Sequence, residues 1–163
     1  MTVTSVEKDL EALTLTVIAD FTAPLEKVWD LWADPRKLET WWGPPNYPAT
    51  FVQHDLTPGA EVRYYMTTPE GEKYHGWWRI NSVTPPTTIE FNDGFSDQDG
   101  NPAEEMGVGL VSVNFSATET GTRMTMLSRN STPEHFQQVL EMGMEEGITL
   151  AVGQMDALLV EAA

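Results

Sequence analysis

The chain of 163 residues has no cysteine. This absence excludes a disulfide framework, a thiolate nucleophile and a Cys-ligated zinc site. No apolar run approaches the roughly 18 residues of a membrane span, and the acidic start of the chain has no basic region followed by an apolar one. We therefore expect a cytoplasmic protein that has no membrane partner.

Basic residues are scarce, since nine Lys and Arg stand against 25 Asp and Glu, which gives a net charge of −16. Such a charge repels phosphate backbones, so nucleic acid is not expected as a partner. The stretches 80–122 and 131–163 contain acids but no Lys or Arg. These stretches indicate a solvated acidic face or, alternatively, a docking patch for a chaperone or another basic protein partner.

Apolar material is abundant enough for a core, because 40% of the residues are hydrophobic and 10% are aromatic, with six Trp and eight Met. The length suits one domain of ordinary size. We predict a single domain over residues 1–163, with a core that spans about 13–161.

Two-residue alternation predicts a first strand over 13–21, and helical spacing then predicts two short helices, the second capped by Asp34. Turn residues separate the strands predicted next, and Gly, Asp, Asn and Pro make 92–107 a predicted loop that could gate a cavity. The further predicted strands are 50–56, 61–67, 73–83, 88–91, 108–117 and 122–129.

After Pro133 a broad apolar stripe predicts one long amphipathic helix to the end of the chain, in which Gly143 and Gly147 allow a close approach to the sheet. The fold class is therefore α+β, with an antiparallel sheet of about six to seven strands covered by this helix.

Several short motifs resemble a known family. They are Phe21-Thr22-Ala23-Pro24, Val28-Trp29, Asp34-Pro35, Trp41-Trp42-Gly43-Pro44, Pro58-Gly59, Gly121-Thr122-Arg123 and Met144-Glu145-Glu146-Gly147. Together they resemble the helix-grip fold of the START and SRPBCC superfamily, of which Bet v-like proteins are a part. Within it they resemble the family related to the C-terminal domain of activators of the heat-shock protein 90 ATPase. Thr57 and Ile148 depart from that pattern, which commonly has Arg and Trp there.

This resemblance implies a curved sheet wrapped around the C-terminal helix, with a cavity between them for a hydrophobic or amphipathic small molecule. A minority of the superfamily act as cyclases, dehydratases or hydrolases. A true chaperone activator has a second domain, for which this chain has no room.

Residues on the strand face that points toward the helix are candidates for lining the cavity. The same residues would also fit an ordinary packed core. Trp42 is a candidate because adjacent Trp41 and Trp42 cannot share one direction, and Tyr64 and Tyr74 offer phenols to a ligand oxygen. The predicted ligand-binding residues are Trp42, His54, Tyr64, Met66, Tyr74, Trp78, Phe91, Met124, Met126, Met144 and Ile148.

Histidine could supply acid-base or metal chemistry, but no spacing joins two of the three to one site. We expect surface or structural roles for His54, His75 and His135, and the alternative for His54 is an acid-base pair with Glu141 or Glu145. Neither a dinucleotide loop nor a calcium loop is complete. No metal and no cofactor are therefore expected.

Three functions remain open. The first is binding of a small apolar or amphipathic molecule. The second is a cofactor-free enzyme that uses Tyr64, Tyr74 or His54 as acid-base groups, although no catalytic motif is recognised. The third is a protein-interaction module that acts through the acidic surface.

Overall fold

The computed structural model describes residues 3–99, 101–103 and 107–161. Within them, one antiparallel sheet has eight strands in the order β1-β2-β8-β7-β6-β5-β4-β3. The strands are β1 (Val3–Asp9), β2 (Thr14–Phe21), β3 (Ala49–Gln53), β4 (Glu61–Thr67), β5 (Lys73–Thr84), β6 (Thr88–Phe95), β7 (Val108–Ala117) and β8 (Thr122–Asn130). The helices are α1 (Leu25–Ala33), α2 (Pro35–Leu38), α3 (Pro133–Glu141), α4 (Met144–Gly153) and α5 (Met155–Glu161).

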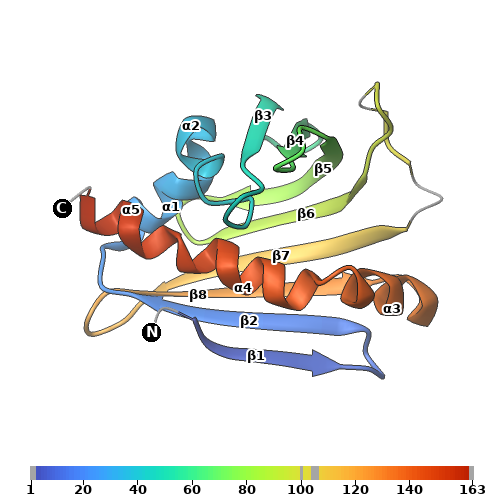
Figure 1. The fold of residues 1–163 in the computed structure, drawn as a ribbon. Coiled ribbons are helices and arrows are strands. Elements are labelled where there is room, and N and C mark those ends of the chain that lie inside the picture. Colours follow the sequence, from blue (N-terminus) through green and yellow to red (C-terminus); the bar gives the residue numbers. More distant parts are fainter. Residues whose placement is uncertain (1–2, 100, 104–106, 162–163) are drawn as a thin grey trace.

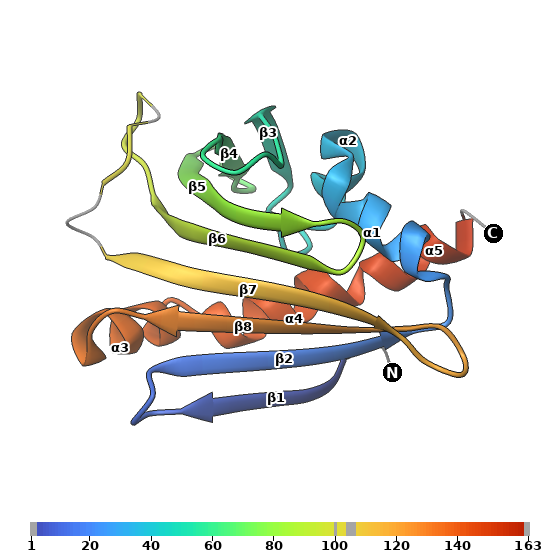
Figure 2. The same cartoon turned by 180° about the vertical axis from the view of Figure 1, so that it is seen from behind.

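The C-terminal helices lie across one face of the curved sheet, as Figure 1 shows in orange and red, and the view from behind in Figure 2 shows the other face. This arrangement confirms the predicted α+β helix-grip fold. The sheet has one strand more than the upper expectation, because β1 pairs with β2 at the edge of the sheet. Residues of β1 are mostly exposed, so they lack the clear apolar alternation by which a strand is recognised in a sequence.

The predicted single C-terminal helix is divided into three. Gly143 ends the first segment with a φ of 86°, a left-handed conformation that glycine adopts without steric cost. Gly143 and Gly147 do not serve a close approach to the sheet, so that prediction is wrong. A Cβ added at Gly143 would meet nothing within 4 Å, and one at Gly147 would touch only Pro44.

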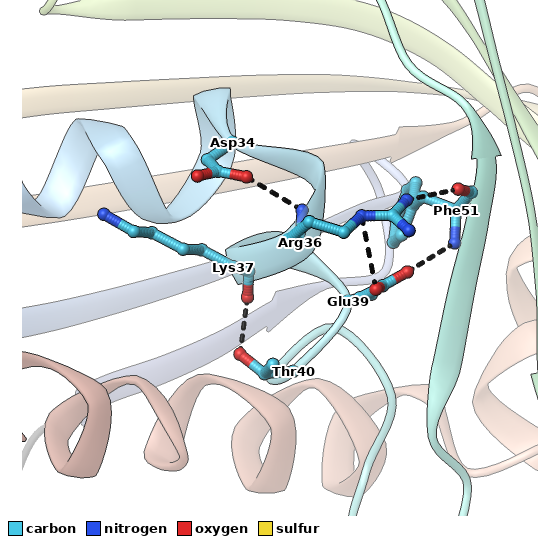
Figure 3. Close-up of polar contacts among 6 residues, drawn as sticks. All are labelled: Asp34, Arg36, Lys37, Glu39, Thr40 and Phe51. Carbon is cyan, nitrogen blue, oxygen red and sulfur yellow. Dashed lines mark hydrogen bonds and ion pairs between the residues drawn. The ribbon is translucent and has the colours of Figure 1, made fainter.

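The short helix α2 is fastened to the edge strand β3 by two charged side chains, as Figure 3 shows. The Arg36 guanidinium donates to the Phe51 carbonyl at 2.8 Å, and a Glu39 carboxylate oxygen accepts from the Phe51 N–H at 3.0 Å. Because β3 is the last strand of the sheet, these are backbone groups for which no further strand supplies partners. Arg36 and Glu39 thus close the sheet edge and fix the turn that leads to Trp41 and Trp42.

An aromatic cluster fills the core beneath α1. Trp32 is fully buried, and its ring centroid lies 5.0 Å from that of Trp41 and 6.0 Å from that of Trp78. Trp78 in turn stacks on Phe91, with 4.3 Å between ring centroids. The cluster ties the helical segment that follows β2 to the strands on the far side of the sheet.

The C-terminal helices are joined to the same region by Gln154. Its side-chain amide donates to the carbonyl oxygens of Trp41 at 3.2 Å and Gly43 at 2.7 Å. Gln154 lies between α4 and α5, so one side chain holds both helices against the turn that carries Trp42.

We predict that Gln154→Ala lowers the free energy of unfolding by about 1 to 2 kcal/mol, because both carbonyls lose a donor in a partly buried position. Urea unfolding measures the change, and Gln138→Ala at an exposed position of α3 is the matched control. Equal unfolding midpoints for the two variants would show that the amide does not hold the helices.

Candidate functional site

A cavity of about 320 Å³ lies between the sheet and the helices α3 and α4. Strands β4, β6, β7 and β8 contribute to its floor, and Pro44 closes it from the side of the α2–β3 turn. The helical wall is mainly apolar and consists of Val139, Met142, Met144 and Ile148, together with Gly143 and Gly147. The break at Gly143 therefore lies directly over the cavity.

Three polar side chains of the cavity lie against glycines. Tyr64 pairs with Gly76 across β4 and β5, and a Cβ at Gly76 would lie 2.5 Å from the phenol ring. Asp93 pairs with Gly109 across β6 and β7, and a Cβ at Gly109 would lie 2.5 Å from the Asp93 carboxylate. The His135 ring fills the corresponding space at Gly107. A Cβ at any of these three positions would displace the polar side chain that occupies its space.

Asp93 is the acidic group of this cavity, and it forms no salt bridge with any residue that the structure describes. Burial raises the pKa of its carboxyl from the ordinary 3.8 to about 6. The residue keeps partial exposure because it borders the cavity. At neutral pH the group is therefore mostly ionised, in surroundings that disfavour the charge.

Tyr64 lies near this carboxylate. Burial raises the pKa of its phenol far above the ordinary value, and the negative charge of Asp93 raises it further. The indole N–H groups of Trp42 and Trp78 oppose this rise, although neither reaches hydrogen-bond geometry. The phenol therefore keeps its proton and can donate it to a hydrogen-bond acceptor.

Unpartnered polar atoms surround the cavity. Among the described residues, no partner reaches the side-chain nitrogens Trp42 Nε1, Asn130 Nδ2 and His135 Nδ1, although all three side chains are about nine-tenths buried. Burial lowers the pKa of His135, so its imidazole is neutral at physiological pH. Trp32, Trp77, Trp78 and Ser96 have such atoms too, but these four residues do not line the cavity. Buried polar groups normally have hydrogen-bond partners, so the three in the cavity are available to a bound molecule.

Two aromatic rings form a corner of the cavity. Trp42 and Tyr64 meet edge to face at 86°, with 6.1 Å between ring centroids. Trp78 supports Trp42 from behind at a centroid distance of 4.9 Å. The corner is rigid because both rings are also part of the packed aromatic cluster.

Sequence comparison matches residues 22–160 to the family model of the Activator of Hsp90 ATPase homolog 1-like protein. The chain belongs to this family. A comparison with curated protein sequences finds no match.

Solved structures share the fold of this family member over nearly its whole length. Protein Ms6760 from Mycobacterium smegmatis is 48% identical with a TM-score of 0.89, and 96% of each chain is covered. A protein from Arthrobacter aurescens is also 48% identical, with a TM-score of 0.94 over 98% of this chain and 93% of the other. A protein from Rhodobacter sphaeroides, 23% identical, matches with a TM-score of 0.81 over 98% and 97% of the two chains and shows the fold alone.

Five of the predicted ligand-binding residues lie at the cavity wall of this family member. They are Trp42, Tyr64, Met66, Met144 and Ile148. Binding by these residues remains a prediction. Four others, Trp78, Phe91, Met124 and Met126, lie in the packed core next to the cavity and do not line it.

The remaining two predicted ligand-binding residues lie away from the cavity. Tyr74 is the second residue of β5 and is 58% exposed. His54 Nε2 lies 3.1 Å from the Trp32 carbonyl, and burial lowers the pKa of its imidazole. The proposed pairing of His54 with a helix glutamate is not seen, since Glu141 accepts from Gln137 and Glu145 pairs with Lys8.

Sequence reasoning missed the polar half of the site. Asp93 was assigned to a loop, but β6 continues to Phe95 because both neighbouring strands pair with it. His135 was expected in a surface or structural role, yet its side chain is buried and borders the cavity. The two-residue period of β6, in which Ile89, Phe91 and Asp93 share a face, was the signal available for Asp93.

Other kinds of site are not supported within the described residues. No three His, Asp or Glu side chains among them are placed to hold a metal ion. In the described part of the chain, no helix combines the length and the apolar character that crossing a membrane requires. The loop expected over 92–107 begins only after Phe95, and its residues 100 and 104–106 lie outside the described ranges.

We predict that Asp93→Asn stabilises this family member at neutral pH. The folded protein binds the Asp93 proton more tightly than the unfolded chain does, so the stability linked to this group is full below pH 3.8 and is lost as the pH rises through about 6. The raised pKa corresponds to at most about 3 kcal/mol, and we expect Asp93→Asn to recover roughly 1 to 3 kcal/mol at pH 7.5.

Urea unfolding at several pH values tests this prediction. The gap between Asp93→Asn and the unmodified protein should shrink toward zero by pH 4, and Asp99→Asn at an exposed position should show no such trend. A gap that stays constant with pH would contradict the buried, unpaired state of the carboxylate.

Proposed function

We propose that this protein binds a small, largely apolar molecule that carries one polar group in the cavity between the sheet and α3–α4. The observation that carries the proposal is a cavity with a mainly apolar helical wall that also contains one carboxylate without an ion-pair partner and three buried side-chain nitrogens without hydrogen-bond partners among the described residues. Ligand sites typically combine an apolar lining with a few polar groups that orient the ligand, and their volumes begin near about 300 Å³.

The orientation of the ligand follows from the distribution of these groups. The apolar body would lie along Met144, Ile148 and Val139, while the polar group would face Asp93 and Tyr64. Methionine thioethers adapt to irregular shapes, so the helical wall suits more than one apolar body. We expect this binding to occur in the cytoplasm.

Acid-base catalysis in the same cavity is the second candidate. A carboxyl whose pKa is near 6 beside a protonated phenol is typical of general acid-base pairs, so Asp93 and Tyr64 are better placed for this role than Tyr74 or His54. Turnover of a bound ligand that is lost in both Asp93→Asn and Tyr64→Phe would favour this candidate over simple binding.

Docking on a chaperone or another basic partner is a separate prediction, since the acidic surface alone supports it. A complex of this kind should weaken strongly as the salt concentration rises.

We predict that Ile148→Trp blocks the cavity without unfolding the protein, because Ile148 lines it and a larger side chain fills space that a ligand needs. The probe is N-phenyl-1-naphthylamine, a neutral molecule whose fluorescence rises in apolar surroundings. Its affinity should fall at least about tenfold in Ile148→Trp. Leu150→Trp is the matched control, since Leu150 belongs to the same helix but is 47% exposed.

Equal affinity of the probe for both variants would place its site outside the cavity. No binding to the unmodified protein would remove the proposed function.

A further inference from the structure

The charges around the cavity are unbalanced. Asp93, Arg129 and His135 are its lining residues that can carry charge. Alternation along β8 places Arg129 on the opposite face of the sheet from the buried Met126, and Arg129 is exposed. Arg129 therefore borders the cavity with its backbone, and the lowered pKa of His135 keeps its imidazole neutral. Among the described residues, no cationic side chain pairs with Asp93.

A carboxylate in this position requires a partner. Buried charges in proteins are normally paired with an opposite charge or bound to a metal, because removal from water is costly. No ion pair to Asp93 forms among the described residues, and none of its neighbours could complete a metal site. A positive group on a ligand would supply the missing charge.

The aromatic corner next to Asp93 favours the same kind of group. Trp42 and Tyr64 meet edge to face at 86° and both line the cavity, so a group in the corner lies against aromatic rings. Aromatic faces attract organic cations, and Trp does so most strongly. Asp93, Trp42 and Tyr64 line the same cavity, so carboxylate and rings can act on one group.

The net charge of the protein also favours a cationic ligand. A net charge of −16 attracts cations and repels anions before they reach the cavity. A fatty acid or another carboxylate ligand would bring a second negative charge toward Asp93, which would be unfavourable at that depth.

We propose that the ligand is an organic amine bound as its cation, with the ammonium group between Asp93 and the Trp42–Tyr64 corner and the apolar body under α4. This inference rests on the proposed function and adds the chemical class of the ligand. Asp93 acts as the counter-ion, and the two aromatic rings exclude water around the ammonium group.

Three probes of nearly the same shape test the charge requirement. They are 2-(1-naphthyl)ethylamine as the cation, 2-(1-naphthyl)ethanol as the neutral analogue and 1-naphthylacetate as the anion. Each is titrated against the full chain at pH 7.5 and 0.15 M salt by isothermal calorimetry, with displacement of N-phenyl-1-naphthylamine as a second readout. We expect the amine to bind at least about tenfold more tightly than the alcohol, and the acetate to bind most weakly.

The variant Asp93→Asn separates the counter-ion from the general charge of the protein. We expect it to lower the affinity for the amine at least about tenfold while the affinity for the alcohol changes by less than about threefold. Asp99→Asn removes the same charge at an exposed position and should leave both affinities unchanged. Circular dichroism confirms that both variants are folded.

Each other outcome overturns the inference in a recognisable way. If the three probes bind equally, or if Asp93→Asn leaves the preference for the amine intact, the amine assignment is wrong while the cavity still binds ligands. If N-phenyl-1-naphthylamine binds but none of the three probes does, the assignment is also wrong. If N-phenyl-1-naphthylamine does not bind either, the proposed function fails and this inference fails with it.

Discussion

The packing of Trp32 against the aromatic residues of the sheet is the interaction on which the rest of the structure depends. Trp32 comes from α1 and contacts Trp41, Trp42 and Trp78 at once, so one buried side chain joins the helical segment, the turn after it and the strand β5. Aromatic groups of this size contribute a large share of core stability. The position of Trp42 at the cavity follows from this packing, and Gln154 then holds the C-terminal helices to the same turn.

Under the helices, one end of the sheet carries the packed core and the other end borders the cavity, and the side chains of the strands determine which. In β7 the core-facing positions are Val111, Val113 and Phe115 toward one end and Gly109 toward the other. The large side chains fill their end, whereas glycine leaves room that Asp93 enters with a carboxyl group. The left-handed Gly143 breaks the helix over this region. Cavity and polar floor thus have a common cause, which is the absence of side chains at a few positions.

Much of the fold could be predicted from the sequence, because alternation and turn residues act locally. The bounds of β4 and β7 agree with the prediction, whereas β1 was missed because an edge strand with few buried residues has no periodic signal. The site was predictable only in its apolar half. Alternation predicts which side chains of a strand point to the same face of the sheet, but not whether other residues cover that face. Tyr64 therefore lies at the cavity, whereas Tyr74 is exposed to solvent. Asp93 continues the two-residue period of Ile89 and Phe91, but its loop-like neighbours hide this signal, and they form a strand through pairing with β5 and β7.

Asp93 has no evident role in folding, and this makes it informative about function. A carboxylate without a cationic partner lowers stability where burial raises its pKa, and an apolar residue of similar size would pack against Gly109 without that cost. Its neighbours in the cavity, Asn130 and His135, likewise leave polar atoms without partners. Proteins violate such packing rules mainly at functional sites. The indole N–H groups of Trp32 and Trp78 also lack partners in the aromatic core. In the cavity, by contrast, such atoms lie together with a carboxylate, which agrees with a site organised around a molecule that the chain itself does not supply.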